Sequence, residues 1–332
     1  MARLRRDFLQ AAACAGAGVL LAPGAWAQGA AAAFPTKTLR IVVPLAPGGA
    51  ADITARTIAQ AISGPLGQPV IVENRPGAGG VIAGEAVSRA EPDGHTMLLV
   101  SSGTAVSASL FKQLPFDTLR DFAPVSQLAT FNLALLVPQD SRFKSLSELL
   151  AHARANPGKL NIGSPQLGTT QHLAAELFKS AAGIDAQTVP FNGTPALINA
   201  LRGNQVDVGV DILGPVMGQI KAGALRPLAV LGDRREAGLP GVPTVAETGA
   251  SLAGFNASSW NGLSVPAKTP EAAIERLNKA INGALAQPEV RQRLADLTLH
   301  AQGSTPRELG ELLARDVRRW GEVIARASIP KQ

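Results

Sequence analysis

Cysteine is nearly absent from this chain of 332 residues, which has a single one, Cys14. We expect Cys14 to be lost with an export signal, so the mature chain would have no disulfide, no thiol nucleophile and no cysteine-based metal site. Tyrosine is absent and aromatic residues make up only 4% of the chain. Because Lys and Arg also form no basic stripe, we expect no nucleic-acid partner.

Long hydrophobic runs and common catalytic motifs are also missing. After the first 27 residues, no apolar run reaches the roughly 20 residues that cross a bilayer. The sequence contains no H-E-x-x-H, no G-x-S-x-G and no G-x-x-x-x-G-K-[ST] motif. The segment 77–82 begins like a dinucleotide-binding fingerprint but has Ile82 in place of the third glycine. We therefore predict no catalytic residues, no metal site and no cofactor.

The N-terminus has the features of a signal peptide. Arg5-Arg6 precede an apolar run from Phe8 to Leu21, and Ala25-Trp26-Ala27 is a small-x-small cleavage site. We predict a signal peptide over 1–27, cleaved after Ala27, and a periplasmic mature protein. The stretch 5–10 is similar to a twin-arginine motif, but two arginines also occur in ordinary signals, so the export route stays open.

The rest of the chain has the composition of a folded protein of about two domains. Hydrophobic residues make up 46% of the chain, the mean hydropathy is +0.14 and the formal net charge is +6. Strands alternate with helices in both halves, which is typical of doubly wound α/β sheets. The strands are expected at 39–44, 70–73, 96–100, 160–163, 188–189, 206–210 and 227–231, and the helices at 52–62, 82–90, 145–155, 172–182, 195–202 and 215–222.

The C-terminal part is helical and has no sheet of its own, so we expect it to pack back on the first half. The first lobe would then comprise 34–130 and 262–332, and the second lobe 131–261. The chain would cross between the lobes twice, near 127–137 and 256–266. Two crossings form a hinge, and the cleft between the lobes could close on a ligand.

Two loops between a strand and a helix are the candidate binding elements. Backbone N–H groups at a helix start are free to meet an anion. Both loops could equally be simple turns, with Asp52 and Thr169–Thr170 as helix caps. The candidate residues from the first loop are Ala46, Gly48, Gly49, Ala50, Ala51 and Asp52, and those from the second loop are Ser164, Gly168, Thr169, Thr170 and His172.

Three further positions, together with His172, bear on the candidate site or its alternatives. Ser102 follows the strand at 96–100, and Asp211 ends the strand at 206–210, where α/β proteins bind ligands. Asp207 is expected in a turn, too far from Asp211 for a carboxylate dyad. We expect His172 to have a structural role rather than a catalytic one.

Many short motifs, in the same order along the chain, resemble the substrate-binding receptors of tripartite tricarboxylate transporters, the Bug-type family. The resemblance covers residues 34 to about 327. The motifs are Ile41-Val42-Val43-Pro44 with Pro47-Gly48-Gly49, the run 72–80 (VENRPGAGG), Pro92-Asp93-Gly94, the run 121–125 (DFAPV), the run 172–178 (HLAAELF), Gln205-Val206-Asp207-Val208, the run 242–247 (VPTVAE) and Ser259-Trp260.

The resemblance implies a type II periplasmic binding-protein fold and a monomeric receptor, not an enzyme. It implies that backbone amides and water hold a carboxylate, which is delivered to membrane permease subunits. A sensing co-receptor of the same fold remains an alternative, as does an exported hydrolase or lyase that uses His172 with Asp211 or Ser164.

The sequence departs from the family in the expected pocket. Ala50-Ala51 stands where the family has small hydroxyl residues, and Pro165 removes a backbone donor. Phe191 replaces a usual Tyr and Asn192 a common Lys, just before Gly193. These changes predict a less polar pocket, suited to a monocarboxylate or an aromatic acid.

Overall fold

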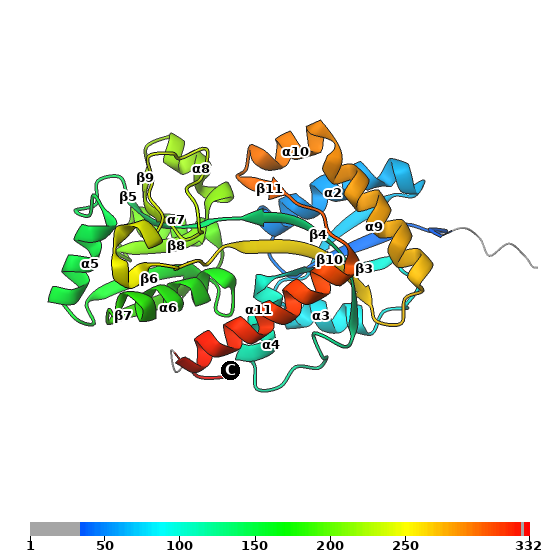
Figure 1. Cartoon of the computed structure of the whole chain (residues 1–332), viewed down its shortest axis with the longest axis horizontal. Helices are drawn as coiled ribbons and strands as arrows, with labels where there is room; N and C mark the ends of the chain where they lie inside the picture. Colours follow the sequence, from blue (N-terminus) through cyan, green and yellow to red (C-terminus); the bar gives the residue numbers. More distant parts are fainter. Residues whose placement is uncertain (1–33, 327–328) are drawn as a thin grey trace, which may run out of the picture. The chain divides into compact units, whose positions relative to one another are not determined.

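Two mixed β-sheets, joined by two strands that run side by side, organise this protein (Figure 1). The computed structural model describes residues 34–326 and 329–332. The predicted signal peptide at 1–27, with Cys14, lies outside the described residues and stays a prediction. Among the helices of the described residues, none combines the length and apolar character needed to cross a membrane.

Sheet A has the strand order β11-β4-β10-β3-β1-β2 and carries the helices of the first lobe. The strands of sheet A are β1 (Leu39–Val43), β2 (Val70–Asn74), β3 (Thr96–Ser101), β4 (Phe122–Phe131), β10 (Ser259–Pro266) and β11 (Leu299–Ala301). The helices of this lobe are α2 (Ala50–Leu66), α3 (Val81–Ser88), α4 (Ser102–Leu110), α9 (Glu271–Ala286), α10 (Pro288–Ala295) and α11 (Pro306–Arg326).

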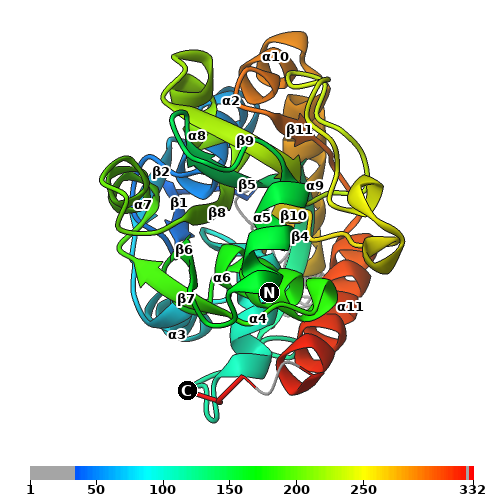
Figure 2. The ribbon, with the colours of Figure 1, turned by 90° about the vertical axis from the view of Figure 1, so that its left-hand side faces the viewer.

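Sheet B has the strand order β7-β6-β8-β5-β9 and belongs to the second lobe. The strands of sheet B are β5 (Leu133–Pro138), β6 (Leu160–Pro165), β7 (Ala186–Phe191), β8 (Val208–Ile212) and β9 (Leu225–Val230). The helices of this lobe are α5 (Leu146–Ala155), α6 (Thr170–Ala182), α7 (Thr194–Arg202) and α8 (Leu213–Lys221). Figure 2 shows this lobe toward the viewer.

The strands within each lobe follow the doubly wound pattern predicted from the sequence. Strand β1 is parallel to β2 and β3, and β6 is parallel to β7 and β8. The strands by which the chain enters each sheet from the other lobe differ from that pattern: β10 is antiparallel to β3, and β5 is antiparallel to β8. Both sheets are therefore mixed rather than purely parallel.

The two crossings consist of β4 and β10, which pair antiparallel from Ser259 opposite Phe131 to Pro266 opposite Phe122. Strand β4 continues through Asn132 into β5, whereas the segment after β9 returns to β10. The expected two-crossing connectivity is therefore confirmed. The boundaries predicted for the two lobes as separately moving bodies stay a prediction.

Helix α4, strand β11 and the first half of β4 were not predicted from the sequence, whereas the second half of β4 lies in the crossing expected near 127–137. The segment of β4 carries Pro124 and polar residues, which hid its strand character. The expectation for the C-terminal helices is confirmed, because α11 packs on α4 and β4, and α9 packs on α2 and β4. Trp320 of α11 is fully buried in this contact layer.

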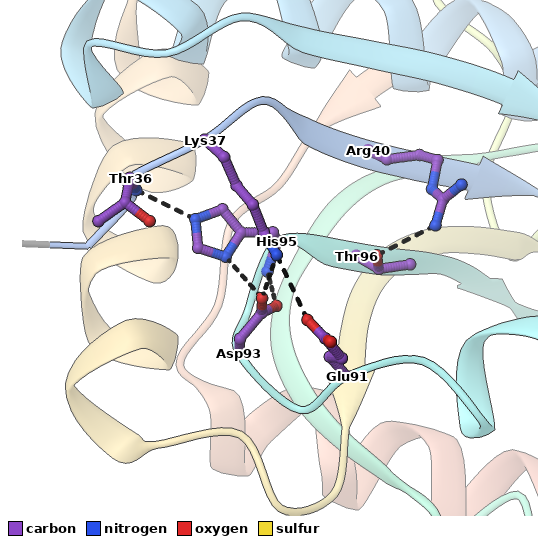
Figure 3. Close-up of polar contacts among 7 residues, drawn as sticks. All are labelled: Thr36, Lys37, Arg40, Glu91, Asp93, His95 and Thr96. Atoms are coloured by element: carbon purple, nitrogen blue, oxygen red, sulfur yellow. Dashed lines mark hydrogen bonds and ion pairs between the residues drawn. The ribbon is translucent and has the colours of Figure 1, made fainter.

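A network of charged side chains surrounds the N-terminal ends of β1 and β3 (Figure 3). The Lys37 ammonium lies 2.8 Å from Asp93 and 3.4 Å from Glu91, and His95 Nδ1 lies 3.2 Å from Asp93. His95 Nε2 accepts a hydrogen bond from the N–H of Thr36 at 3.1 Å. Although Lys37, Glu91, Asp93 and His95 line a cavity of about 370 Å³, their charged groups pair with one another, so the network ties the starts of β1 and β3 together.

The buried carboxylate of Asp316 ties α11 to the rest of the first lobe. It accepts hydrogen bonds from Ser102 Oγ at 3.2 Å and from Trp260 Nε1 at 2.7 Å. We predict that Asp316→Ala lowers the free energy of unfolding by about 2–4 kcal/mol, because two buried donors lose their acceptor. Urea unfolding measures the change. Glu322→Ala, at an exposed position of the same helix, is the control, and equal midpoints for both variants would contradict the prediction.

Candidate functional site

The first candidate loop connects β1 to α2. The N-cap of α2 is Gly49, with φ −86° and ψ 172°, and no side chain caps this helix. The N–H groups of the first turn therefore have neither an intrahelical partner nor a side-chain cap. Gly48 has φ +86°, a conformation that favours glycine, while Ala46 is exposed. The loop presents uncapped backbone donors, as an anion site requires.

Asp52 shapes this loop from within. Its Oδ2 accepts a hydrogen bond from the N–H of Gly48 at 3.0 Å, and its Oδ1 lies 3.0 Å from the guanidinium of Arg56. Burial raises the pKa of Asp52, but the hydrogen bonds from Arg56 and Gly48 outweigh it and hold the pKa below its usual value. The carboxylate thus pairs with Arg56 and fixes the backbone of the loop, and its role in ligand binding stays a prediction.

The second candidate loop connects β6 to α6. Thr169 is the N-cap, and its hydroxyl accepts from the N–H of His172 at 3.3 Å and donates to the carbonyl of Pro165 at 2.6 Å. The capping alternative therefore describes Thr169. Ser164, by contrast, is fully buried, and its Oγ has no hydrogen-bond partner among the described residues.

Helix α4, absent from the sequence predictions, supplies a third helix start. Ser101 caps it: the Ser101 side chain accepts from the N–H of Gly103 at 3.1 Å, and its own N–H donates to Thr104 Oγ1 at 3.0 Å. A Ser three residues before a Thr at the end of an apolar strand was the available signal. Ser102 is used internally, because its hydroxyl donates to Asp316.

The starts of α4 and α6 face each other across the two lobes. A Cβ atom placed on Gly103 would lie 3.9 Å from Thr170 Oγ1. One placed on Gly168 would lie 3.3 Å from Leu110 Cδ2 and 3.9 Å from the Cα of Gly79. The structure thus brings the second loop against the first lobe, with two helix N-termini on facing sides.

The loop after β7 lies beside the second loop. The N–H of Gln166 donates to the carbonyl of Phe191 at 2.8 Å, and Gly193 is the N-cap of α7, with φ +86° and no side-chain cap. The Phe191 ring packs against the core near Gly163, whereas Asn192 is exposed. Phe191 therefore serves packing here, which removes one reason to expect an aromatic ligand.

Asp211 is a fully buried carboxyl at the end of β8. Its Oδ1 accepts from Gln171 Nε2 at 3.2 Å and from the N–H of Ile212 at 2.7 Å, and its Oδ2 has no hydrogen-bond partner among the described residues. Burial raises the pKa of Asp211 to about 6, although Thr194, Ile212 and Gln171 oppose the shift. Asp207, before the same strand, accepts from the N–H of Asn161 instead, in the expected turn.

His172 forms no catalytic pair in the described part of the chain. It is buried, and burial lowers the pKa of its ring below the usual value, so the ring is neutral at pH 7. Its Nδ1 has no partner, Ser164 Oγ has none, and Asp211 bonds to Gln171 rather than to the ring. The hydrogen bonds between nucleophile, base and orienting acid that a hydrolase of this kind needs are not formed.

No group of three or more acidic, His or Cys side chains suited to a metal occurs among the described residues.

Comparisons with known proteins agree on one family. The model of the tripartite tricarboxylate transporter family receptor matches residues 54–329. The "UPF0065 protein in tcbD-tcbE intergenic region" of Pseudomonas sp. (strain P51) is 40% identical over 292 residues, which is 88% of this chain and 87% of that protein.

Two solved structures have the same fold and carry ligands. R. palustris Rpa4515 with adipate has a TM-score of 0.84 at 30% identity, with 90% of this chain and 99% of that one covered. MatC (Rpa3494) from Rhodopseudomonas palustris with bound malate has a TM-score of 0.81 at 34% identity, with coverages of 88% and 100%. The two-lobe α/β fold predicted from the sequence is thus confirmed.

The raised pKa of Asp211 predicts a pH-dependent cost. Because the folded protein holds the Asp211 proton more tightly than the unfolded chain, the contribution of Asp211 to stability is highest at low pH and falls as the pH rises from about 4 to about 6. We predict that Asp211→Asn removes this slope and adds roughly 2–3 kcal/mol at pH 8, since the asparagine oxygen still accepts both hydrogen bonds.

Urea unfolding at pH 4, 5, 6 and 8 measures this effect. Asp207→Asn, at the other end of β8, controls for the isosteric change. If Asp211→Asn is less stable than the unchanged protein at pH 8, the ionised carboxylate is stabilising and the prediction is wrong.

Proposed function

Because the chain belongs to the tripartite tricarboxylate transporter receptor family, we propose that it is a periplasmic receptor that captures a small carboxylate between its lobes and delivers it to a membrane permease. The observation that carries this proposal is the uncapped start of α2 at the carboxyl end of β1. The facing starts of α4 and α6 support it. A periplasmic location also agrees with the predicted signal peptide.

Backbone donors suffice for the proposed binding. A hydrogen bond to a charged group contributes about 1.5–3 kcal/mol. Three or four such bonds, less the entropic cost of binding, reach about −8 kcal/mol, or micromolar affinity. Neither loop carries a Lys or Arg, and the one acidic side chain, Asp52, is engaged with Arg56 and with the N–H of Gly48. A ligand carboxylate would therefore meet N–H groups rather than an arginine.

Small dicarboxylates are the first ligands to test, because two structural relatives carry adipate and malate. The expectation of a monocarboxylate or an aromatic acid now rests mainly on Ala50-Ala51, Pro165 and Asn192. Phe191 is partly buried and packs against the core. Ala50 and Ala51 are buried and carry no polar side-chain atom, so on this side of the site only the backbone can bond the ligand.

A charge placed at the N-cap of α2 tests the proposal. A Cβ atom on Gly49 would meet nothing within 4 Å, and its φ of −86° suits any residue, so Gly49→Asp and Gly49→Asn both fold and both supply a good N-cap. Only aspartate repels a carboxylate bound at the same N–H groups. We predict that Gly49→Asp binds the ligand at least about tenfold more weakly than Gly49→Asn, a difference of about 1.4 kcal/mol.

Isothermal titration at low ionic strength measures the two dissociation constants, first with adipate and malate and then with aromatic and monocarboxylic acids. Equal affinities of the two variants for a ligand that binds the unchanged protein would place the carboxylate away from α2. The melting temperatures of both variants confirm that they are folded.

A further inference from the structure

A second place where the lobes meet lies outside the proposed ligand loops, at the start of α8. A Cβ atom on Gly214, in the first turn of α8, would lie 2.1 Å from the carbonyl oxygen of Leu297. Leu297 belongs to the first lobe, in the segment between α10 and β11 (Figure 1). Such a close approach of helix and backbone is possible only because residue 214 is glycine.

Three polar side chains join the lobes beside this contact. Glu236, from the loop after β9, is 3% exposed, and its Oε2 accepts from Asn132 Nδ2 at 3.1 Å. The same oxygen lies 3.3 Å from Nε2 of His300, a residue of β11. Glu236 belongs to the second lobe and His300 to the first, so this ion pair spans the two lobes.

Asn132 places this ion pair at the hinge itself. It is the single residue between β4 and β5, and its carbonyl accepts from the N–H of Leu213, where α8 begins. Its side chain packs so closely on Gly232 that a Cβ atom there would lie 2.1 Å from Asn132 Oδ1. The start of α8, the hinge residue and the loop after β9 are thus one connected group.

We propose that the Gly214–Leu297 contact and the Glu236–His300 ion pair form a latch that holds the two lobes closed, and that loss of the His300 proton weakens it. Opening about Asn132 would separate Gly214 from Leu297 and His300 from Glu236. The inference rests on the proposed function only in one respect, the nature of the ligand that the closed lobes would enclose. The latch itself contains no residue of the candidate ligand loops.

The titration of the latch follows from the groups around it. The pKa of His300 is raised, first of all by its hydrogen bond with Glu236 and also by the negative charge of Glu236. Burial and the positive charge of Arg234 lower this pKa, but they do not outweigh Glu236. Burial raises the pKa of Glu236, but the contacts with His300 and Asn132 outweigh it and hold the pKa below its usual value. On α10, which packs against β11, Arg293 bonds Gln60 and Asp296 bonds Gln292, while Glu289 and Arg291 are exposed.

The raised pKa of His300 determines how closure depends on pH. The closed state raises the pKa of His300, so the closed state is favoured while His300 is protonated. This contribution is complete below the usual pKa of histidine, about 6.5, and is lost as the pH rises through the raised value. The latched protein is therefore expected to open between neutral and alkaline pH.

A pair of glycine substitutions on one helix tests the latch without any ligand. Gly214→Ala adds a methyl group against a backbone oxygen of the other lobe, so the lobes must separate. Gly218→Ala makes the same change one turn later, where a Cβ atom meets nothing within 4 Å. Small-angle X-ray scattering at pH 6 is expected to give a larger radius of gyration for Gly214→Ala than for Gly218→Ala and the unchanged protein.

The histidine ring reports on the same event by NMR. The described chain has four histidines, His95, His152, His172 and His300, and His300→Gln identifies the signal of His300. We expect the His300 pKa to fall in Glu236→Gln and also in Gly214→Ala, but not in Gly218→Ala. We also expect the radius of the unchanged protein to increase from pH 6 to pH 9, with no such increase in His300→Gln. His152→Gln, in α5, is the matched control and keeps the increase.

Two results would contradict the proposed latch. Equal radii for the two alanine variants, or a His300 pKa that Gly214→Ala leaves unchanged, would overturn the latch. Because no ligand is present, failure of the carboxylate to bind would not affect this result, and binding of a carboxylate would not rescue it.

Discussion

The pairing of β4 with β10 is the constraint on which the rest of the structure depends. These two strands are the links between the sheets, and β10 also pairs with β3 in the centre of sheet A. Because they run side by side, the carboxyl ends of the parallel strands in the two lobes come to lie near one another. The helix starts that follow β3 and β6 then meet across the lobes, as Gly103 and Thr170 do.

Most polar side chains of the candidate site form hydrogen bonds that fix the shape of its loops. Asp52 holds Gly48 and Arg56, Thr169 caps α6, and Ser102 bonds Asp316. Backbone N–H groups are what remains for a ligand, and helix N-termini are suited to anions without a neighbouring cation. Under the proposed function, this division would let a receptor of modest charge bind a carboxylate through its backbone. Ser164, His172 and Asp211 are exceptions, because each has a buried polar atom without a hydrogen-bond partner among the described residues.

Much of this architecture could be predicted from the sequence, and the failures have physical causes. Alternation of apolar strands and amphipathic helices located both lobes, and two unmatched segments indicated the two crossings. The first half of strand β4 was missed because Pro124 and polar residues interrupt its apolar pattern, and its partner β10 lies more than a hundred residues away. The latch residues Asn132, Glu236 and His300 gave no local signal, since their contact depends only on tertiary structure.

The sequence located the helix starts of the candidate loops but not the contacts of individual side chains, and the ligand-binding role of both stays a prediction. The glycine-rich turn at 46–52 showed a helix start, but no pattern could tell that Asp52 pairs with Arg56 or that Phe191 packs against the core. Helix α4 was missed because the weak Ser101–Thr104 cap follows directly on a strand. Backbone conformation is encoded locally at such turns, whereas the direction of a side chain is decided by distant packing.

The central claim is that the helix starts between the lobes recognise negative charge, and one comparison tests it most directly. The thermal stability of the unchanged protein would be measured with adipate, malate and other small carboxylates, and in parallel with the corresponding uncharged amides. A ligand at one hundred times its dissociation constant adds about 2.7 kcal/mol of stability. We predict stabilisation by at least one carboxylate and none by its amide. Equal stabilisation by both, or by neither for every carboxylate, would contradict it.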